Sequence, residues 1–233
     1  MLPAFSIFLP ITIAIAATAV VHLTNNLFKL LLTYRNINYT VFARFGVPAG
    51  IASLLGAYLL LNLENIEQNI TWQFGTFITE TTIVKLIIGL VIVIFAVFEL
   101  LTSFRNFSFS PKWIPLGGLL SGFFGGLSGH QGALRSAFLI KLGLRKEVFI
   151  ATGVAIAVLV DLLRITIYGL VLFNFQAIQD AGVDGLIIGA IIGGIAGAVI
   201  GRKLLNNVTL RSVQFIVSGL LLLTGLTLIF GLL

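Results

Sequence analysis

The length of the apolar stretches constrains this chain more than any other feature. The sequence is 58% hydrophobic, and charged residues make up only 9% of it, whereas soluble domains carry roughly 25% charged residues. A helix of about 20 residues crosses the ~30 Å hydrocarbon layer of a bilayer. Seven segments are long enough: 2–34, 41–61, 80–102, 113–142, 147–174, 184–203 and 209–232. We find no alternating strands of the kind a membrane β-barrel needs, so we predict an all-α polytopic membrane protein.

The charged residues divide the connecting loops into two kinds. Residues 62–79 and 174–184 contain acidic side chains and neither Lys nor Arg. The basic residues of the other loops are Arg35, Arg44, Arg105, Lys112, Lys141, Arg145, Lys146, Arg202, Lys203 and Arg211. Lysine and arginine collect on the cytoplasmic side of membrane proteins. We therefore expect the basic loops to be cytoplasmic and the two acidic loops external, which explains the net charge of +6 without a nucleic-acid partner.

This assignment predicts two hairpins within the membrane. Segment 113–142 joins two basic loops, so it should enter the membrane and return as two half-helices. We expect the same of segment 2–34, because a helix of 30 residues measures ~45 Å and is long for a single span. Each hairpin is followed by two crossings, which predicts a first repeat over 1–104 and a second over 105–233 with one extra C-terminal span. Repeats are typical of secondary transporters, which bind substrate at the repeat interface near the bilayer midplane.

The two predicted breaks contain the only histidines of the chain. In the second, the sequence Ser128-Gly129-His130-Gln131-Gly132 interrupts a glycine-rich helix. In the first, His22 is followed by Asn25 and Asn26. A helix that begins inside the membrane has amide groups without partners and a positive partial charge, which suits an anion.

A cation follows each break. Arg135 falls in the first turn of the second half-helix, and Lys29 follows the first break. Charges away from the interface are costly and usually mark a pathway, although Lys29 could instead snorkel toward Arg35. We expect Arg135 to bind an anion bidentately and Lys29 to act as a point charge. The predicted anion-binding residues are His22, Asn25, Asn26, Lys29, Ser128, Gly129, His130, Gln131, Gly132, Arg135 and Arg164.

Asp161 and Arg164 lie one helical turn apart in the crossing 147–174. They could form an ion pair that neutralises itself. Alternatively, Arg164 is a second anion ligand and Asp161 a proton-coupling carboxylate, with His22 and His130 as further candidates for proton coupling.

The glycines have a structural interpretation. Small residues let membrane helices approach closely, and this is our expectation for Gly117, Gly118, Gly122, Gly125 and Gly126. We expect the glycines of residues 185–201 to serve packing as well. Each histidine could likewise be held by one interhelical hydrogen bond.

Residues 117–144, GGLLSGFFGGLSGHQGALRSAFLIKLGL, and residues 146–164, KEVFIATGVAIAVLVDLLR, resemble the second-half signature of the sulfite exporter TauE/SafE family of anion permeases. The resemblance implies a multi-pass protein of the bacterial plasma (inner) membrane that transports sulfur oxyanions or organosulfur anions. By this resemblance, Gly125, Gly126, Gly129, Gln131 and Gly132 stand at the positions of the family's glycine cluster. The chain departs from the all-glycine form at Ser128, His130, Gln131 and Arg135, and its first half has no such cluster.

We therefore predict a secondary permease for a small oxyanion such as sulfite or an organosulfonate, with no enzymatic activity, cofactor or metal. Its expected partners are the anion and membrane lipid, and the sequence also allows a homodimer. A passive anion channel is the alternative. A remote alternative is an intramembrane serine protease, because residues 126–129 read Gly-Leu-Ser-Gly. That chemistry needs a histidine base on a helix after the serine, and no histidine follows His130. The absence of cysteine excludes disulfides and thiolate sites, and two histidines with few carboxylates suit a hard cation poorly.

Overall fold

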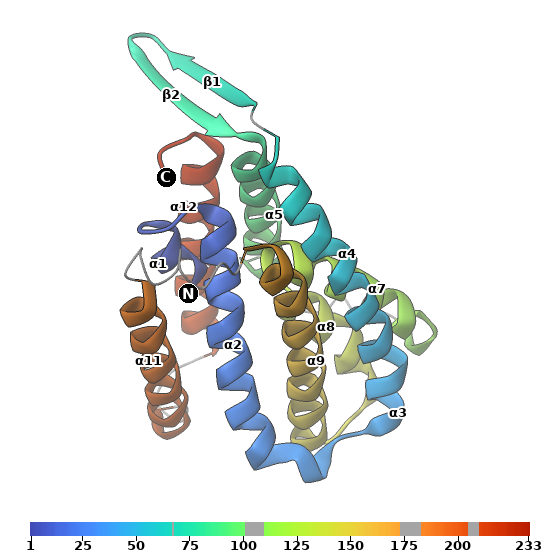
Figure 1. The fold of residues 1–233 in the computed structure, drawn as a ribbon. Helices are drawn as coiled ribbons and strands as arrows, with labels where there is room; N and C mark the ends of the chain where they lie inside the picture. The colour runs from blue at the N-terminus through green and yellow to red at the C-terminus, as the bar shows by residue number, and fades with distance from the viewer. Residues whose placement is uncertain (67, 101–109, 173–182, 205–209) are drawn as a thin grey trace.

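A computed structural model describes residues 1–66, 68–100, 110–172, 183–204 and 210–233. Figure 1 shows a bundle of helices with a single β-hairpin at one end. Four helical stretches are long and apolar enough to cross a membrane: Ile11–Asn36, Tyr39–Glu64, Ile83–Leu100 and Lys146–Gly169. The predicted all-α membrane class is confirmed, whereas the division into two repeats stays a prediction.

The first half of the chain supplies three of the long helices. Its elements are α1 (Leu2–Ser6), α2 (Ile11–Thr33), the 3-10 turn η1 (Tyr34–Asn36), α3 (Tyr39–Val41), the π-helical turn η2 (Phe42–Gly46), α4 (Val47–Glu64), β1 (Asn69–Phe74), β2 (Phe77–Thr82) and α5 (Ile83–Leu100). The π turn directly precedes Pro48, the second residue of α4. Because proline has no amide hydrogen, the regular helical hydrogen-bond ladder is interrupted there.

The second half contains the predicted hairpin. Its elements are η3 (Pro111–Trp113), α7 (Ile114–Ser128), α8 (Gly132–Leu139), η4 (Ile140–Leu142), α9 (Lys146–Leu172), α11 (Val183–Leu204) and α12 (Leu210–Ile229). A Cβ atom built on Gly117, near the start of α7, would lie 2.3 Å from the Phe138 ring, near the end of α8. The two short helices therefore fold back on each other. That segment 113–142 enters the membrane and returns to its own side stays a prediction. Arg105 and most of the predicted acidic loop 174–184 lie outside the described residues.

The prediction of a hairpin in segment 2–34 is wrong. Helix α2 runs without interruption from Ile11 to Thr33, through His22, Asn25 and Asn26. These residues do not end the helix, since the stretch has no glycine or proline and polar side chains there can bond to a neighbouring helix or back to their own. The Thr24 hydroxyl, for example, donates to the Val20 carbonyl at 2.9 Å. The real interruption comes earlier, between α1 and α2, where Pro10 precedes the first residue of α2.

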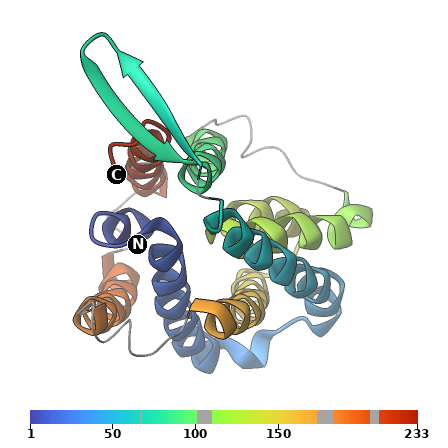
Figure 2. The ribbon, with the colours of Figure 1, turned by 45° about the horizontal axis from the view of Figure 1, so that its top comes forward.

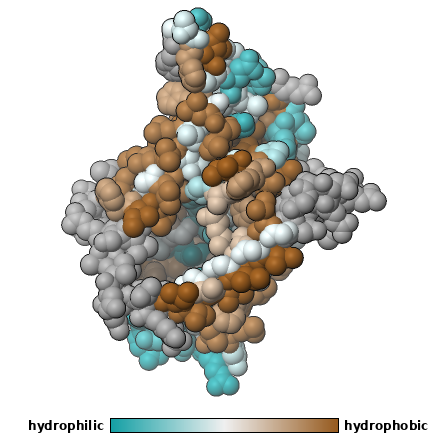
Figure 3. Space-filling model, turned by 90° about the vertical axis from the view of Figure 1, so that its left-hand side faces the viewer, coloured by the Kyte–Doolittle hydropathy of each residue, from teal (hydrophilic) through white to brown (hydrophobic). Residues whose placement is uncertain are grey.

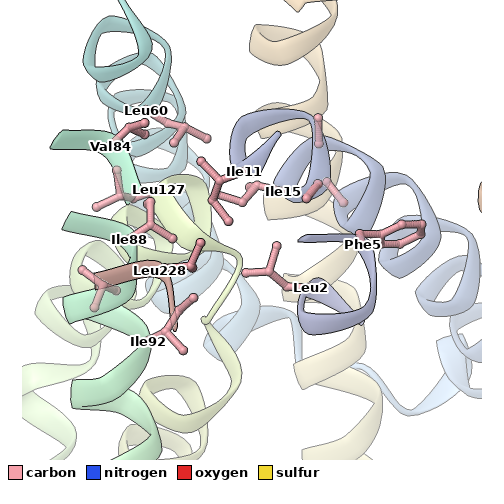
Figure 4. Packing of buried hydrophobic residues seen from close by; sticks show 14 of the residues in the cluster. Leu2, Phe5, Ile11, Ile15, Leu60, Val84, Ile88, Ile92, Leu127 and Leu228 are labelled. Carbon is pink, nitrogen blue, oxygen red and sulfur yellow. The ribbon is translucent and has the colours of Figure 1, made fainter. Parts of the chain in front are cut away.

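Figure 4 shows the larger of two hydrophobic cores, in which residues of α1, α2, α4, α5, α7 and α12 meet. Leu2 and Phe5 of α1 pack with Ile11 and Ile15 of α2, so the short first helix is fixed to the bundle by apolar contacts. Figure 2 shows α2 lying between α11 on one side and α9 on the other. This central position lets α2 face the break between α7 and α8.

The packing role predicted for the glycines of α7 is confirmed. A Cβ atom at Gly122 would lie 1.9 Å from the carbonyl oxygen of Ala49 in α4. Gly118 and Gly126, one turn to either side, meet the carbonyl oxygens of Phe45 and Ser53 in the same way. The backbones of α4 and α7 are therefore in direct contact.

The same prediction is wrong for most of α11. Among the described residues, nothing lies within 4 Å of a Cβ atom built on Gly185, Gly189, Gly193 or Gly197. Of the α11 glycines whose surroundings the structure describes, Gly194 alone is close to a neighbour, the Asn25 amide of α2. Helix α11 contacts α2 at Gly194. The regular four-residue spacing of the other α11 glycines therefore did not identify the residue that makes the contact.

The β-hairpin was not predicted, and the statement that no part of the chain alternates is wrong over residues 69–82. Strands β1 and β2 pair antiparallel from Asn69–Thr82 to Phe74–Phe77, and Gly75 in the turn has a φ of 66°. The hairpin is tied to the end of α12, because the Trp72 indole donates to the Ile229 carbonyl at 2.9 Å and the Thr81 hydroxyl to the Leu228 carbonyl at 2.7 Å. In Figure 1 this end is opposite to η1 and α3.

Candidate functional site

The break between α7 and α8 is built by glycine. Helix α7 ends at Ser128, and Gly129 has a φ of 81°, in the left-handed region that L-residues with a side chain avoid. Helix α8 begins at Gly132, and the Gln131 side chain does not cap it. The Arg135 amide is the first to bond back, to the Gln131 carbonyl at 3.1 Å. The amides of residues 132–134 thus have no acceptor among the described residues.

Space is available beside these free amides. A Cβ atom built on Gly132 meets no described atom within 4 Å. Arg135, in the same turn, is half-buried. The start of α8 therefore offers donors beside open space. Figure 3 shows one face of the molecule with a recess that has hydrophilic surface inside it.

The end of α7 is held by side chains of α9. The Arg164 guanidinium donates from Nη1 to the Gly125 carbonyl at 3.0 Å, and the Tyr168 hydroxyl donates to the Gly126 carbonyl. Both carbonyls belong to the last turn of α7, where the helix itself supplies few or no donors. Tyr168 was not among the predicted site residues, although residues 161, 164 and 168 have the spacing of one helical face.

Asp161 is the centre of a buried polar cluster. Its Oδ1 lies 2.8 Å from Nη2 of Arg164, and both side chains are 0% exposed. Asn26 of α2 donates to Oδ2 at 3.1 Å, and Gln131 in the break donates to Oδ1 at 3.3 Å. The carboxylate thus joins α2, α9 and the break. The predicted ion pair is present, and the same arginine hydrogen-bonds to α7 through Nη1, whereas its buried Nε has no hydrogen-bond partner among the described residues.

Arg135 differs from Arg164 in its partners. Its Nη1 donates to Oε1 of Gln131 at 3.2 Å, and Nε would lie 3.5 Å from a Cβ atom at Gly153 of α9. Among the described residues it forms no ion pair. Because Asp161 is already paired with Arg164, the cluster carries one more positive than negative charge. An anion at the start of α8 would balance that charge.

The remaining predicted residues are more scattered. Ser128 is buried and its hydroxyl donates to the Phe124 carbonyl at 3.0 Å, so no histidine accepts this proton as a serine protease would require. The His130 ring contacts the Ser128 carbonyl through Nδ1 at 3.0 Å and stacks on Phe95 with centroids 6.3 Å apart. His130 is thereby directed toward α5.

On α2, only Asn26 joins the cluster. Lys29 is exposed and forms no side-chain hydrogen bond or ion pair within the described part of the chain. His22 is half-buried and also has no hydrogen-bond partner there. The Asn25 amide points to Gly194 of α11, and its buried Oδ1 has no donor. The predicted free amides after Asn25 do not exist, because α2 is continuous.

An apolar pocket of about 220 Å³ lies next to the break but does not suit an anion. It is lined by Val91, Ile94, Phe95, Phe98, Leu120, Phe124 and Leu134. All of these side chains are hydrocarbon, so the pocket offers no donor to an oxyanion.

Comparison with known proteins identifies the family. Residues 1–228 match the model of the family described as sulfite exporter TauE/SafE. No curated protein and no solved structure matches the chain. The match covers α1 to α12, including the break and the Asp161 cluster. The chain therefore belongs to the sulfite exporter TauE/SafE family of membrane transporters.

Proposed function

We propose that this protein is a secondary transporter that binds a small oxyanion at the start of α8. The substrate class is sulfite, another sulfur oxyanion or an organosulfonate. The observation that carries the proposal is Arg135, a half-buried guanidinium with a neutral protein partner and no ion pair in the described chain. Removing a charge from water is costly unless it is paired, so the site favours a negatively charged ligand.

Two further features support an oxyanion. The amides of residues 132–134 have no acceptor among the described residues, and a helix start attracts negative charge. Arginine presents its donors in a planar fork that matches two oxygens of one anion. The amides and Arg135 together therefore suit a ligand with several oxygen atoms.

The proposed site has one helix break rather than two. In place of a second break it has the continuous helix α2, which contributes Asn26 to Asp161. Ser128 is not included as an anion ligand, since its hydroxyl already donates to the Phe124 carbonyl. Arg164 is not included either, since it is 0% exposed and its charge is paired with Asp161. We propose Asp161 as the proton-coupling carboxylate, because it joins α2 to the break and a change in its charge would act on both.

Flux into proteoliposomes tests the proposal. Arg135→Gln should abolish sulfite transport while the protein stays folded and inserted. The matched control is Arg145→Gln, the same change at an exposed arginine just after η4, which should leave transport intact. Undiminished transport by Arg135→Gln would refute the proposed site.

The same assay separates a transporter from a passive channel. A proton-coupled transporter accumulates sulfite against its gradient when a pH gradient is imposed. A channel only equilibrates the anion with the membrane potential, and Asp161→Asn would leave that flux unaltered.

A further inference from the structure

The Gln131 amide lies between two charged groups. Its Nε2 donates to Asp161 Oδ1 at 3.3 Å, and its Oε1 accepts from Arg135 Nη1 at 3.2 Å. A carboxylate can only accept and a guanidinium can only donate, so these two partners fix which way the amide faces. The Gln131 carbonyl also accepts from the Ser121 hydroxyl at 2.9 Å. The residue is therefore held at its backbone while its amide group can still turn.

Protonation would turn Asp161 from an acceptor into a donor toward the Gln131 amide. A carboxyl protonated on Oδ1 gains an O–H donor there, which needs an acceptor at the place where Nε2 of Gln131 now lies. If the amide turns over, Oε1 accepts from Asp161 and Nε2 faces Arg135. Two donors then oppose each other, and leaving the half-buried Arg135 without an acceptor is costly. An oxyanion beside α8 would accept from both groups.

We propose that Gln131 is a positioning residue that transmits the protonation state of Asp161 to Arg135. It makes proton binding and anion binding favour each other. This inference rests on the proposed function, because it takes Arg135 as the anion ligand. It goes further because it assigns the coupling between proton binding and anion binding to one neutral side chain, Gln131.

Other charged groups surround Asp161 and have to be separated from this effect. Arg164 comes from α9 itself and Arg135 from α8. His22 lies one turn before Asn26 on α2, which runs antiparallel to α9 (Figure 1). His130 comes from the break, whereas α7 has no charged residue and α4 only Glu64 at its far end. Neither histidine hydrogen-bonds to Asp161 or Gln131 in the described chain, so a change at Gln131 isolates the relay.

The test measures anion affinity against pH. The probes are sulfate and methanesulfonate, whose charges stay constant from neutral to mildly acidic pH, and the readout is isothermal titration of purified protein. In the wild type we expect acidification to tighten binding by roughly 5- to 150-fold, the usual range for coupled sites. Gln131→Met keeps the size of the side chain and removes both hydrogen bonds. We expect it to reduce the pH effect to a few-fold at most, the part due to charge alone.

Two variants serve as controls. Asp161→Asn is permanently neutral and can donate to Oε1 of Gln131, so it should bind tightly at every pH. Asn26→Ala removes a hydrogen bond to Asp161 but does not touch the relay. It should keep the size of the pH effect and move only its midpoint. If Gln131→Met does not fold, Gln131→Asn replaces it, since its shorter amide cannot span both partners.

The outcomes separate the two proposals. A pH effect of wild-type size in Gln131→Met, or in Gln131→Asn, overturns the relay while the anion site stands. A wild type that binds neither probe at any pH overturns the proposed function and the relay with it. Loss of binding in Arg135→Gln, together with a reduced pH effect in Gln131→Met, supports both.

Discussion

Replacing Gly122 by alanine tests the contact that positions the break. The added methyl carbon would lie 1.9 Å from the Ala49 carbonyl oxygen, about 1.5 Å short of the 3.4 Å at which ordinary contact begins. Backbone cannot rotate away as a flexible side chain can, so α4 and α7 must separate. Overpacking typically costs about 1–3 kcal/mol, and a backbone clash belongs at the upper end of that range. For a chain of this size, about 3 kcal/mol lowers Tm by roughly 6–12 °C.

The assay is thermal unfolding of the purified protein in detergent, followed by circular dichroism. The matched control is Gly193→Ala in α11, where no described atom lies within 4 Å of the new carbon. Alanine there should be neutral or slightly stabilising, because glycine costs about 0.5–1 kcal/mol within a helix. Equal melting temperatures for Gly122→Ala and Gly193→Ala would refute the packing of α4 on α7 described above.

Two further changes address the buried cluster and the hairpin. Asp161→Ala and Asp161→Asn both leave Arg164 as an uncompensated buried charge, so each should cost about 3–5 kcal/mol and lower Tm; wild-type Tm in both variants would contradict the ion pair. Trp72→Phe removes the indole donor to the Ile229 carbonyl, which should cost about 0.5–1.5 kcal/mol and speed proteolysis within residues 69–82, and unchanged cleavage would argue against this anchor.

The sequence predicts the elements whose signal is local. The long apolar segments gave the membrane helices, and the glycine and serine residues from Ser128 to Gly132 gave the break, because only a left-handed residue such as Gly129 lets the chain turn there. The basic loops on both sides of segment 113–142 indicate that it returns to its own side of the membrane, which stays a prediction. These features need no knowledge of which helices meet.

The features that the sequence does not predict depend on contacts between helices that are far apart in the sequence. Asn25 and Asn26 looked like helix breakers, but Asn26 has an acceptor on α9, 135 residues away in sequence, and the helix continues. Lys29 and Arg135 were both predicted to bind the anion, with snorkelling as the alternative for Lys29; in the structure Lys29 is exposed and Arg135 lies beside Gln131. The glycines of α7 and α11 share a spacing, and only those of α7 contact a neighbouring backbone.

The position of a bound anion tests the central claim most directly. Selenite has the shape and charge of sulfite, and its selenium scatters anomalously, so diffraction from crystals grown with selenite would locate it. We expect an anomalous peak beside Gly132, within hydrogen-bonding distance of the Arg135 guanidinium, that is absent from Arg135→Gln crystals. A peak at Lys29 or elsewhere, with the start of α8 empty, would contradict the proposed site.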